Sequence, residues 1–161
     1  MDLYGFEVEV VFLIHNDEVL AYAWHYDERR ALKHLKKIME YHNLKGKIKK
    51  SIEFEKWLKE EVDKVVMKGA KFTLPDFEYQ NRFVYENIIE IPRSKTATYA
   101  QIARILSVKY TEMLKALMRN PFQILILCHR LLTNKGSLFG FYPLGKEVKR
   151  KLLEIEGVRL R

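Results

Sequence analysis

The hydrophobic period of this chain changes near Asp27, which limits it to folds that combine a small sheet with helices. Residues 3–14 and 18–26 are rich in valine and aromatic side chains that favour strands, and turn-forming residues separate them. From Asp27 onward apolar residues recur at helical spacing, first over 31–39 and then over 54–66. The first part of the chain is therefore predicted to be a mixed α/β unit.

The chain is predicted to divide at residues 74–76, where Leu-Pro-Asp interrupts the helical pattern. Before this break, residues 45–50 resemble a charged connector between helices. After it, apolar residues at helical spacing predict a helix over 77–90. Two units result, residues 1–75 and residues 76–161.

The second unit contains a helix-turn-helix pattern. Thr98 is predicted to cap a helix over 99–106, and after a tight turn a second helix begins at Thr111. Two short helices joined by about four residues are typical of this motif. The alternative is that the two apolar faces only pack together. A strand over 122–132 and a final helix over 145–157 follow.

Positive charge is concentrated in the second unit. Residues 93–161 carry 14 Lys/Arg and 4 Asp/Glu, a net charge of +10, whereas residues 1–92 carry 15 and 17, a net charge of −2. Such asymmetry favours a polyanionic partner, most often nucleic acid. A solvated basic surface is the alternative. Over residues 93–119 six basic side chains face one acid, Glu112; they are Arg93, Lys95, Arg104, Lys109, Lys115 and Arg119.

Composition excludes several classes of protein. Of the 161 residues, 48% are hydrophobic, which is too many for a disordered chain. No apolar run approaches the length of a membrane span, and the acidic first residues do not resemble a signal peptide. A single cysteine excludes an internal disulfide, and no Cys/His group has zinc spacing. We therefore expect a cytoplasmic protein with no bound metal.

The run ILILCHRLL (124–132) raises the question of reactivity, because it ends in the only cysteine, Cys128. Most lone cysteines are small buried hydrophobes. Here, however, cationic neighbours would lower the thiol pKa. In an extended strand Cys128 and Arg130 would share one face and His129 the other, so a bridging water or a local bend would be needed for His129 to act on the thiol. Glu154 and Glu156 are both candidates to orient that base, and both can equally be exposed helical carboxylates.

Three segments together resemble the O6-alkylguanine–DNA alkyltransferase family. RNPFQILILCHRLL (119–132) resembles its active-site signature, IPRSKTATYAQIARIL (91–106) the start of its helix-turn-helix, and GFYPLGKEVKRKLLEIEG (140–157) its closing loop and helix. The three segments also match in order and spacing, and this combination is specific where each piece alone would be weak.

The resemblance implies a fold and a function. The fold is α/β, with a ribonuclease H-like N-terminal domain and a mostly helical C-terminal domain that carries a winged helix-turn-helix-like motif. The implied enzyme is a methylated-DNA–protein-cysteine S-methyltransferase. It flips O6-alkylguanine out of double-stranded DNA and takes the alkyl group irreversibly onto Cys128. The resemblance further implies a monomer that works without a cofactor.

The resemblance also implies roles for the residues around the thiol. Cys128 accepts the alkyl group, and His129 acts on it through a water. Glu156 polarises that histidine, which decides between the two glutamates. Asn120 steadies the active-site turn, and Arg130 holds the two halves of the domain together.

Further implied contacts involve the substrate base and the DNA. Tyr99 presses on the target phosphate and helps protonate the leaving base, while Tyr142, Pro143 and Leu144 border the substrate pocket. The implied DNA contacts are Arg93, Lys95, Thr98, Tyr99, Lys109, Thr111, Glu112, Lys115, Ala116 and Arg119.

Two other functions are compatible with part of these features. One is a relative that binds alkylated DNA without reacting, although such relatives lack the cysteine. The other is a transcription factor that uses only the helix-turn-helix, which would leave Cys128, His129 and Glu156 without a role.

Overall fold

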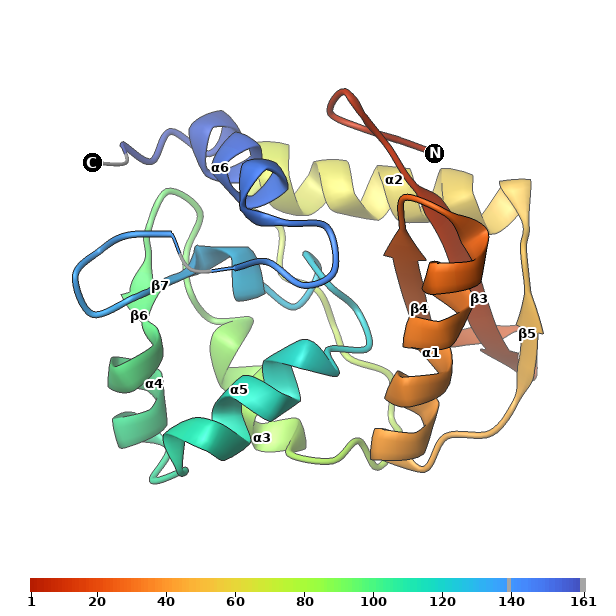
Figure 1. Ribbon diagram of the computed structural model, residues 1–161, viewed down its shortest axis with the longest axis horizontal. Helices are drawn as coiled ribbons and strands as arrows, with labels where there is room; N and C mark the ends of the chain where they lie inside the picture. The colour runs from red at the N-terminus through yellow and green to blue at the C-terminus, as the bar shows by residue number, and fades with distance from the viewer. Residues whose placement is uncertain (139, 160–161) are drawn as a thin grey trace.

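The computed structural model describes residues 1–138 and 140–159, and it has the mixed α/β architecture that the change of period predicts (Figure 1). One end holds a sheet and a helix: β3 (Glu9–His15), β4 (Glu18–His25), β5 (Lys47–Lys49) and α1 (Glu28–His42). The other end holds α3 (Arg82–Ile88), α4 (Tyr99–Ile105) and α5 (Tyr110–Met118). Two helices lie along one side, α2 (Ile52–Lys68) and α6 (Lys146–Ile155). Within the described residues no helix has both the length and the apolar character needed to cross a bilayer.

The N-terminal sheet has the antiparallel order β4-β3-β5. Asn16 and Asp17 make the turn between β3 and β4 with positive φ angles of 48° and 61°, as a two-residue hairpin requires. Nearly every residue of β3 and β4 is buried, because both faces of the sheet are covered, and this explains their imperfect alternation. The strand predicted over 3–14 is interrupted, so that β1 (Asp2–Leu3) and β2 (Phe6–Glu7) form a separate hairpin.

The connector predicted over 45–50 contains a strand that the sequence reading missed. Its residues Lys47–Lys49 pair with Phe12, Leu13 and Ile14 of β3. Only Ile48 is partly buried, while its two lysine neighbours are exposed. An edge strand needs only a short apolar contact, and three residues are too few for a detectable period.

The N-terminal helices begin and end where local capping rules predict. The Asp27 carboxylate accepts a hydrogen bond of 2.8 Å from the Arg30 backbone N–H, and α1 ends at Asn43 in the left-handed conformation. Ser51 caps α2, which ends at Gly69 with a φ of 70°. The long α2 runs from the sheet to α6, so it connects the two ends of the molecule (Figure 1).

The helix-turn-helix pattern forms as predicted, with shifted bounds. Thr98 and Gln101 make a reciprocal capping box at the start of α4, and Lys109 occupies the N-cap of α5. The helix predicted over 77–90 forms only as α3. It starts late because the Arg82 guanidinium holds the carbonyls of Leu74, Pro75 and Phe77 in a non-helical turn.

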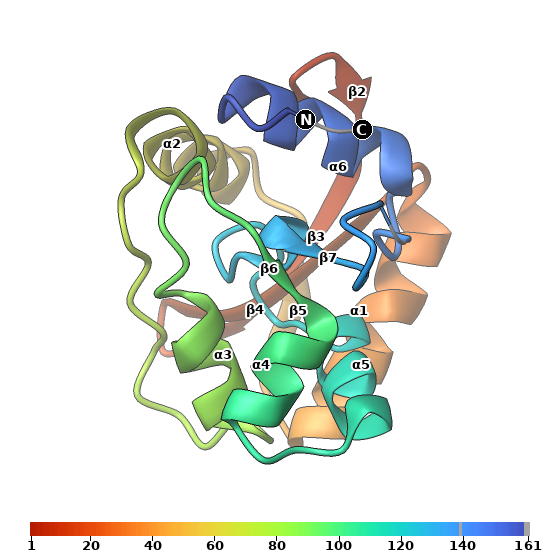
Figure 2. The same ribbon diagram turned by 90° about the vertical axis from the view of Figure 1, so that its left-hand side faces the viewer.

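The strand predicted over 122–132 is wrong over most of its length. Only β7 (Leu131–Leu132) is extended, and it pairs in parallel with β6 (Ala97–Thr98) (Figure 2). Residues 122–127 are irregular, and every one of them is buried. An uninterrupted apolar run indicates that a segment is buried on all sides. A packed loop and a central strand are both buried in this way, so the run does not distinguish them.

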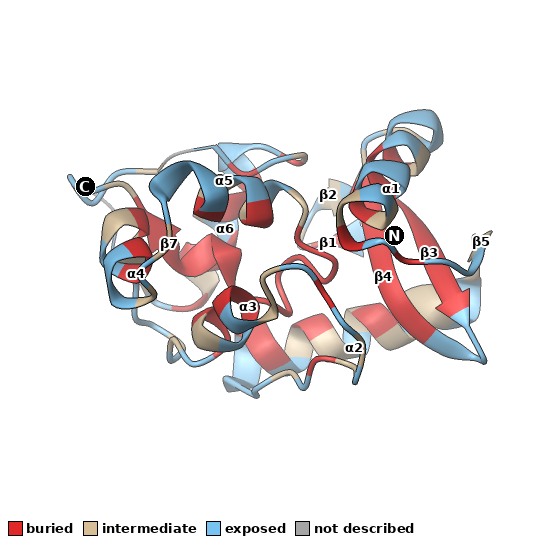
Figure 3. Cartoon of the chain, turned by 90° about the horizontal axis from the view of Figure 1, so that it is seen from below, coloured by how far each residue is buried: buried red, intermediate tan, exposed pale blue. Residues whose placement is uncertain are grey.

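The two halves of the protein meet where Pro121 and Gln123 lie against β4. The Tyr22 backbone N–H donates to the Pro121 carbonyl at 3.0 Å, and Trp24 Nε1 donates to Gln123 Oε1 at 2.5 Å. One apolar core runs through both halves, with the buried faces of the helices turned inward (Figure 3). The division between residues 75 and 76 therefore stays a prediction about folding units.

His42 is buried at this junction and has a partner on each ring nitrogen. Nδ1 accepts a hydrogen bond of 3.0 Å from the Gln80 backbone N–H, so Nε2 is the protonated nitrogen and donates to the Arg119 carbonyl at 2.7 Å. Burial lowers the pKa of His42 to about 4. Protonation of His42 would keep the hydrogen bond to the Arg119 carbonyl but break the one from the Gln80 backbone N–H.

We expect the protein to lose stability as the pH falls from about 6.5 toward 4. The unfolded chain binds a proton at His42 below 6.5 whereas the folded chain does not, so acid favours unfolding. For this residue the loss at pH 4.5 should be about 2.5 kcal/mol. Urea unfolding at pH 7.0 and pH 4.5 measures it. The free energy of unfolding of His42→Gln should change less with pH than that of the parent. His15→Gln, at an exposed position, should change as the parent does. If the free energy of unfolding changed equally with pH in all three proteins, the role assigned to His42 would be contradicted.

Candidate active site

Cys128 begins a turn of 3-10 helix, η1 (Cys128–Arg130), that follows the buried loop. The prediction that Cys128 and Arg130 share one strand face is therefore wrong. In a tight turn the three side chains point in different directions, and among the described residues no direct hydrogen bond joins Cys128 to His129.

The loop before the turn surrounds the sulfur with hydrogen-bond donors. Asn120 Nδ2 donates to Cys128 Sγ at 3.4 Å and to the Ile126 carbonyl at 3.1 Å, while Asn120 Oδ1 accepts from the Phe122 N–H at 2.9 Å. Ile124 has a φ of 80°, a conformation that β-branched residues avoid, and its N–H is also directed at the sulfur. The strained loop thus stabilises negative charge on Cys128.

Cys128 lines a cavity of about 340 Å³ with mostly apolar walls. The other lining residues are Tyr99, Leu114, Leu117, Met118, Gln123, Gly140, Phe141 and Tyr142. Of the three predicted pocket residues only Tyr142 is among them. Pro143 and Leu144 lie outside it, and Leu144 is buried with its carbonyl hydrogen-bonded to Tyr26. The sulfur is thus reached from the cavity although Cys128 is 6% exposed.

Gln123 is a cavity residue that the sequence reading missed, and it ties the cavity to both halves of the protein. Its side chain accepts from Trp24 of β4 and donates to the carbonyl of Tyr142. The Tyr142 ring packs edge-on against His34 of α1, with the ring centroids 4.9 Å apart. The N-terminal unit therefore supports one wall of the cavity.

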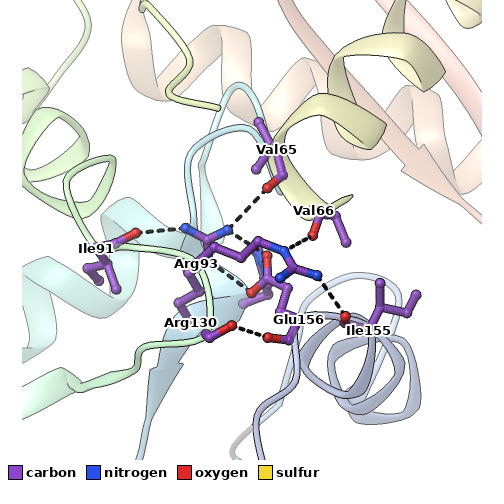
Figure 4. Close-up of polar contacts among 9 residues, drawn as sticks. Val65, Val66, Ile91, Arg93, Arg130, Ile155 and Glu156 are labelled. Atoms are coloured by element: carbon purple, nitrogen blue, oxygen red, sulfur yellow. Dashed lines mark hydrogen bonds and ion pairs between the residues drawn. The ribbon is translucent and has the colours of Figure 1, made fainter. Parts of the chain in front are cut away.

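Behind the cavity lies a fully buried charge network. His129 Nε2 is 3.1 Å from Glu156 Oε2, while Arg130 binds the same carboxylate through Nε at 2.9 Å and Nη2 at 2.5 Å (Figure 4). Glu156 is 0% exposed, whereas Glu154 is exposed on the same helix. The structure therefore selects Glu156 from the two candidates. Burial opposes its charge, but the hydrogen bonds from His129 and Arg130 hold the pKa of Glu156 below its usual value.

This network fixes the protonation state of His129. Burial lowers the pKa of His129, and the carboxylate of Glu156 can only accept a hydrogen bond. Nε2 therefore carries the proton of a neutral ring, and Nδ1 is left as a basic lone pair. Nδ1 is buried and has no hydrogen-bond partner among the described protein atoms. His129 is thus arranged as a proton acceptor.

The same network is fastened to the C-terminal end of α2. Arg130 donates to the carbonyls of Ile91 and Val65, at 2.7 Å and 3.3 Å, and Arg93 donates to those of Val66 and Ile155, at 2.6 Å and 2.9 Å (Figure 4). Cationic side chains stabilise helix C-termini in this position. The predicted DNA contact at Arg93 therefore needs correction, because its guanidinium group is turned inward onto two helix ends.

The thiol does not have the lowered pKa that its cationic neighbours predict. Burial raises the pKa of Cys128, and the hydrogen bond from Asn120 and the charge of Lys149 offset only part of that effect. The guanidinium of Arg130, two residues further along the chain, is already paired with Glu156. Cys128 therefore needs a base to ionise at neutral pH, a role that fits His129.

Tyr99 and Lys149 form a buried pair at the cavity wall. Tyr99 is the first residue of α4 and is 4% exposed, and its hydroxyl oxygen accepts a hydrogen bond of 2.8 Å from Lys149 Nζ. The sequence reading missed Lys149, although it precedes buried Leu152 and Leu153 by three and four residues and so shares their helix face.

The predicted DNA contacts differ in how far their side chains are exposed. Exposed side chains on or next to α4 and α5 include Lys95, Lys109, Thr111, Glu112 and Lys115. Thr98 and Arg119 are partly buried, and Thr98 uses its hydroxyl group to cap α4. Ala116 needs correction as a contact: it is 0% exposed, because it faces the core rather than the outer side of α5. Within the described residues, no group of three or more potential ligand side chains is suited to a metal ion.

Comparison with known proteins identifies a family for the second half of the chain. Residues 79–158 match the family described as 6-O-methylguanine DNA methyltransferase, DNA binding domain. Methylated-DNA–protein-cysteine methyltransferase of Methanothermobacter thermautotrophicus is 41% identical over 83 residues, which are 52% of this chain and 46% of that protein. The Saccharolobus solfataricus protein of the same name is 39% identical over 77 residues, which are 48% of this chain and 50% of that protein. The chain thus spans about half the length of these curated relatives.

Solved structures extend the likeness to the whole fold. The crystal structure of O6-methylguanine-DNA methyltransferase from Pyrococcus kodakaraensis superposes with a TM-score of 0.70, covering 94% of this chain and 92% of that one at 23% identity. Mycobacterium tuberculosis OGT in complex with DNA gives a TM-score of 0.53 over 61% of this chain and 63% of that one, at 25% identity. The mixed α/β fold class is therefore confirmed.

Proposed function

The chain belongs, through residues 79–158, to the 6-O-methylguanine DNA methyltransferase family, and we propose that it repairs DNA by a single transfer of an alkyl group from guanine O6 to Cys128. The observation that carries this proposal is the chain's one thiol in the wall of a cavity, next in sequence to a buried His129–Glu156 pair. The proposed partner is double-stranded DNA containing O6-alkylguanine, bound in the cytoplasm by one copy of the protein.

In the proposed reaction the thiolate displaces guanine from the alkyl carbon. His129, held by Glu156, takes the thiol proton through a water. The Cys128 sulfur then forms a bond to the alkyl carbon while the carbon–O6 bond breaks, and its electron pair stays on guanine. A proton from the Tyr99 hydroxyl group neutralises the departing base. The thioether that results is stable because the cysteine sulfur is a poorer leaving group than guanine. The alkyl group therefore stays on Cys128, and each protein molecule acts once.

DNA binding is proposed for the outer surface of α4 and α5. A base inside a duplex cannot reach the buried sulfur, so the nucleotide must be flipped into the cavity at a cost of a few kcal/mol. Phosphate contacts that ignore sequence suit this task, since damage arises anywhere. The exposed Lys115 lies on α5 and the exposed Lys109 directly precedes it, and the same helix supplies Leu114 and Met118 to the cavity wall. The relative from Mycobacterium tuberculosis was crystallised with DNA, which supports this partner.

Removing either lysine should weaken binding to all duplexes alike. Lys109→Ala and Lys115→Ala each remove one phosphate contact, so the slope of log affinity against log salt should fall by about 1. Fluorescence anisotropy with an undamaged duplex at several salt concentrations measures the slope. Lys56→Ala, at an exposed position on α2, is the matched control and should keep the parental slope. An effect of Lys56→Ala as large as the others would count against this surface.

The proposed transfer is tested by mass spectrometry. The protein is incubated with a duplex that contains one O6-methylguanine, digested, and its peptides are weighed. One methyl group on the Cys128 peptide, never more than one per molecule, is the expected result. Binding of the damaged duplex with no gain in mass would instead identify a lesion-binding protein that does not react.

A further inference from the structure

Helix α1 carries a row of exposed basic side chains along one side. The row consists of Arg30, Lys33 and Lys37, whose spacings of three and four residues place them on one face of the helix. Arg30 is paired with Asp27, whereas no ion pair among the described residues holds Lys33 or Lys37. The two lysines therefore present charge that is not neutralised locally, although the part of the chain before the helix-turn-helix has a net negative charge.

The row on α1 continues onto α5, which packs beside it (Figure 2). Tyr41 follows Lys37 by four residues on the same face, and Lys115 Nζ of α5 lies 6.0 Å from the Tyr41 ring centroid. The Arg119 carbonyl at the end of α5 accepts the hydrogen bond of 2.7 Å from His42. The charged groups around this junction are four cations and two carboxylates: Lys33, Lys37, Lys115, Arg119, Glu40 and Glu112. The positive surface of α5 is therefore continuous with one on α1.

The same side of α1 borders the mouth of the cavity that contains Cys128. His34 of α1 packs edge-on against Tyr142, which lines the cavity and is 42% exposed. Burial lowers the pKa of His34 to about 4, and the charges of Arg119 and Lys37 act in the same direction, so both cations lie near this ring. A duplex at the cavity mouth therefore lies within reach of α1 as well as of α5.

We propose that α1 is a second phosphate-binding surface for double-stranded DNA, with Lys33 and Lys37 as its contacts. This inference rests on the proposed function, because the cavity determines where the duplex lies. The helices α4, α5 and α1 then form one basic track, with α5 in the middle (Figure 1). Contacts between ammonium groups and phosphates do not depend on sequence, and they contribute to the free energy that flipping a base requires. The N-terminal unit thus takes part in holding the substrate.

The salt dependence of DNA binding tests this surface. The double variant Lys33→Ala/Lys37→Ala removes two phosphate contacts, so the slope of log affinity against log salt should fall by about 2. Fluorescence anisotropy with an undamaged duplex at several salt concentrations measures the slope. The matched control Lys56→Ala/Lys68→Ala removes the same net charge from exposed positions on α2 and should keep the parental slope. Equal slopes for the two double variants would overturn the proposal.

A charge-conserving variant separates lost contacts from a damaged helix. Lys33→Arg/Lys37→Arg keeps both positive charges, so its slope should be close to the parental one. Both side chains are exposed, so the alanine and arginine variants should melt at the parental temperature. An arginine variant that binds as weakly as the alanine variant, with a lower melting temperature in both, would show that α1 was disrupted and would contradict a role in phosphate binding.

Lysine acetylation maps the surface directly in the parent protein. The protein is treated with sulfo-N-hydroxysuccinimide acetate with and without the undamaged duplex, and peptide masses give the extent of modification at each lysine. DNA should protect Lys33, Lys37 and Lys115, whereas exposed Lys56 should react equally in both samples. Protection of Lys115 without protection of Lys33 and Lys37 would confine the duplex to α5, and the inference would then be wrong.

These measurements fail separately from the test of the proposed function. If the parent gains no methyl group from O6-methylguanine but the two α1 lysines are protected and set the slope, alkyl transfer fails and the binding surface stands. If the parent gains the methyl group while Lys33→Ala/Lys37→Ala keeps the parental slope, the α1 surface fails and the proposed function stands.

Discussion

Replacing Cys128 with serine should abolish methyl transfer while leaving the affinity for undamaged duplex DNA nearly parental. Serine is smaller than cysteine and its hydroxyl group is far less acidic than a thiol, so the rate of transfer should fall by at least about 10³-fold. DNA contacts are proposed for the exposed side of α4 and α5, and Cys128 lies inside the protein. Stopped-flow transfer assays and fluorescence anisotropy measure the two quantities.

Serine also keeps the fold, which makes this substitution informative. The side chain at position 128 is buried and hydrogen-bonded by Asn120, a contact that a serine hydroxyl group can accept. Asn120→Ser provides the matched comparison: it removes the donor to the sulfur and to the Ile126 carbonyl, so both rate and stability should fall. A Cys128→Ser protein that loses duplex binding as severely as transfer would contradict the separation of the two sites.

Glu156→Gln should slow transfer by roughly 10²-fold and also destabilise the protein strongly. Glutamine cannot neutralise Arg130, which is 2% exposed, so a buried charge is left without a counter-ion. Breaking a buried pair in this way costs about 3–5 kcal/mol, which corresponds to a melting temperature lower by roughly 10 °C. Calorimetry and single-turnover rates, recorded well below both melting temperatures, separate the two effects.

Glu154→Gln is the matched control for this prediction. Glu154 lies two residues earlier in the chain and is exposed. Its replacement should therefore leave the transfer rate and the melting temperature within error of the parent. If Glu154→Gln and Glu156→Gln behaved alike, neither the relay role nor the structural role of Glu156 would hold. A Glu156→Gln protein with parental transfer and low stability would remove only the relay role.

Local signals in the sequence predicted those elements whose cause is local. The cap at Thr98 was predicted correctly, because a capping box depends on residues three positions apart. Helices α1 and α2 were predicted from their apolar spacing for the same reason. Residues 122–127 were misread as a strand, since a fully buried loop and a buried strand have the same apolar composition. The short β5 was missed because its pairing partner is distant in sequence.

In the candidate site, too, the residues were predictable from local motifs, whereas their long-range contacts were not. The resemblance predicted Cys128, His129 and Glu156, and the structure brings the last two together across 27 positions. Residue spacing alone could not choose between Glu154 and Glu156, because the orientation of α6 decides which carboxylate is buried. Lys149 was missed and Arg93 was assigned wrongly for a related reason: both lie in basic stretches that resemble solvated surface, yet packing turns both inward.

The order and spacing of residues along this chain were enough to predict a mixed α/β protein, a helix-turn-helix, one candidate thiol and the family they belong to. They were enough because caps, hydrophobic periods and signature motifs depend on neighbours within a few positions. Which charges are buried, which carboxylate meets His129, and how the thiol ionises depend on the angle at which α6, α2 and the buried loop pack together. Those angles follow from contacts between segments that are distant in sequence, so only the folded structure defines them.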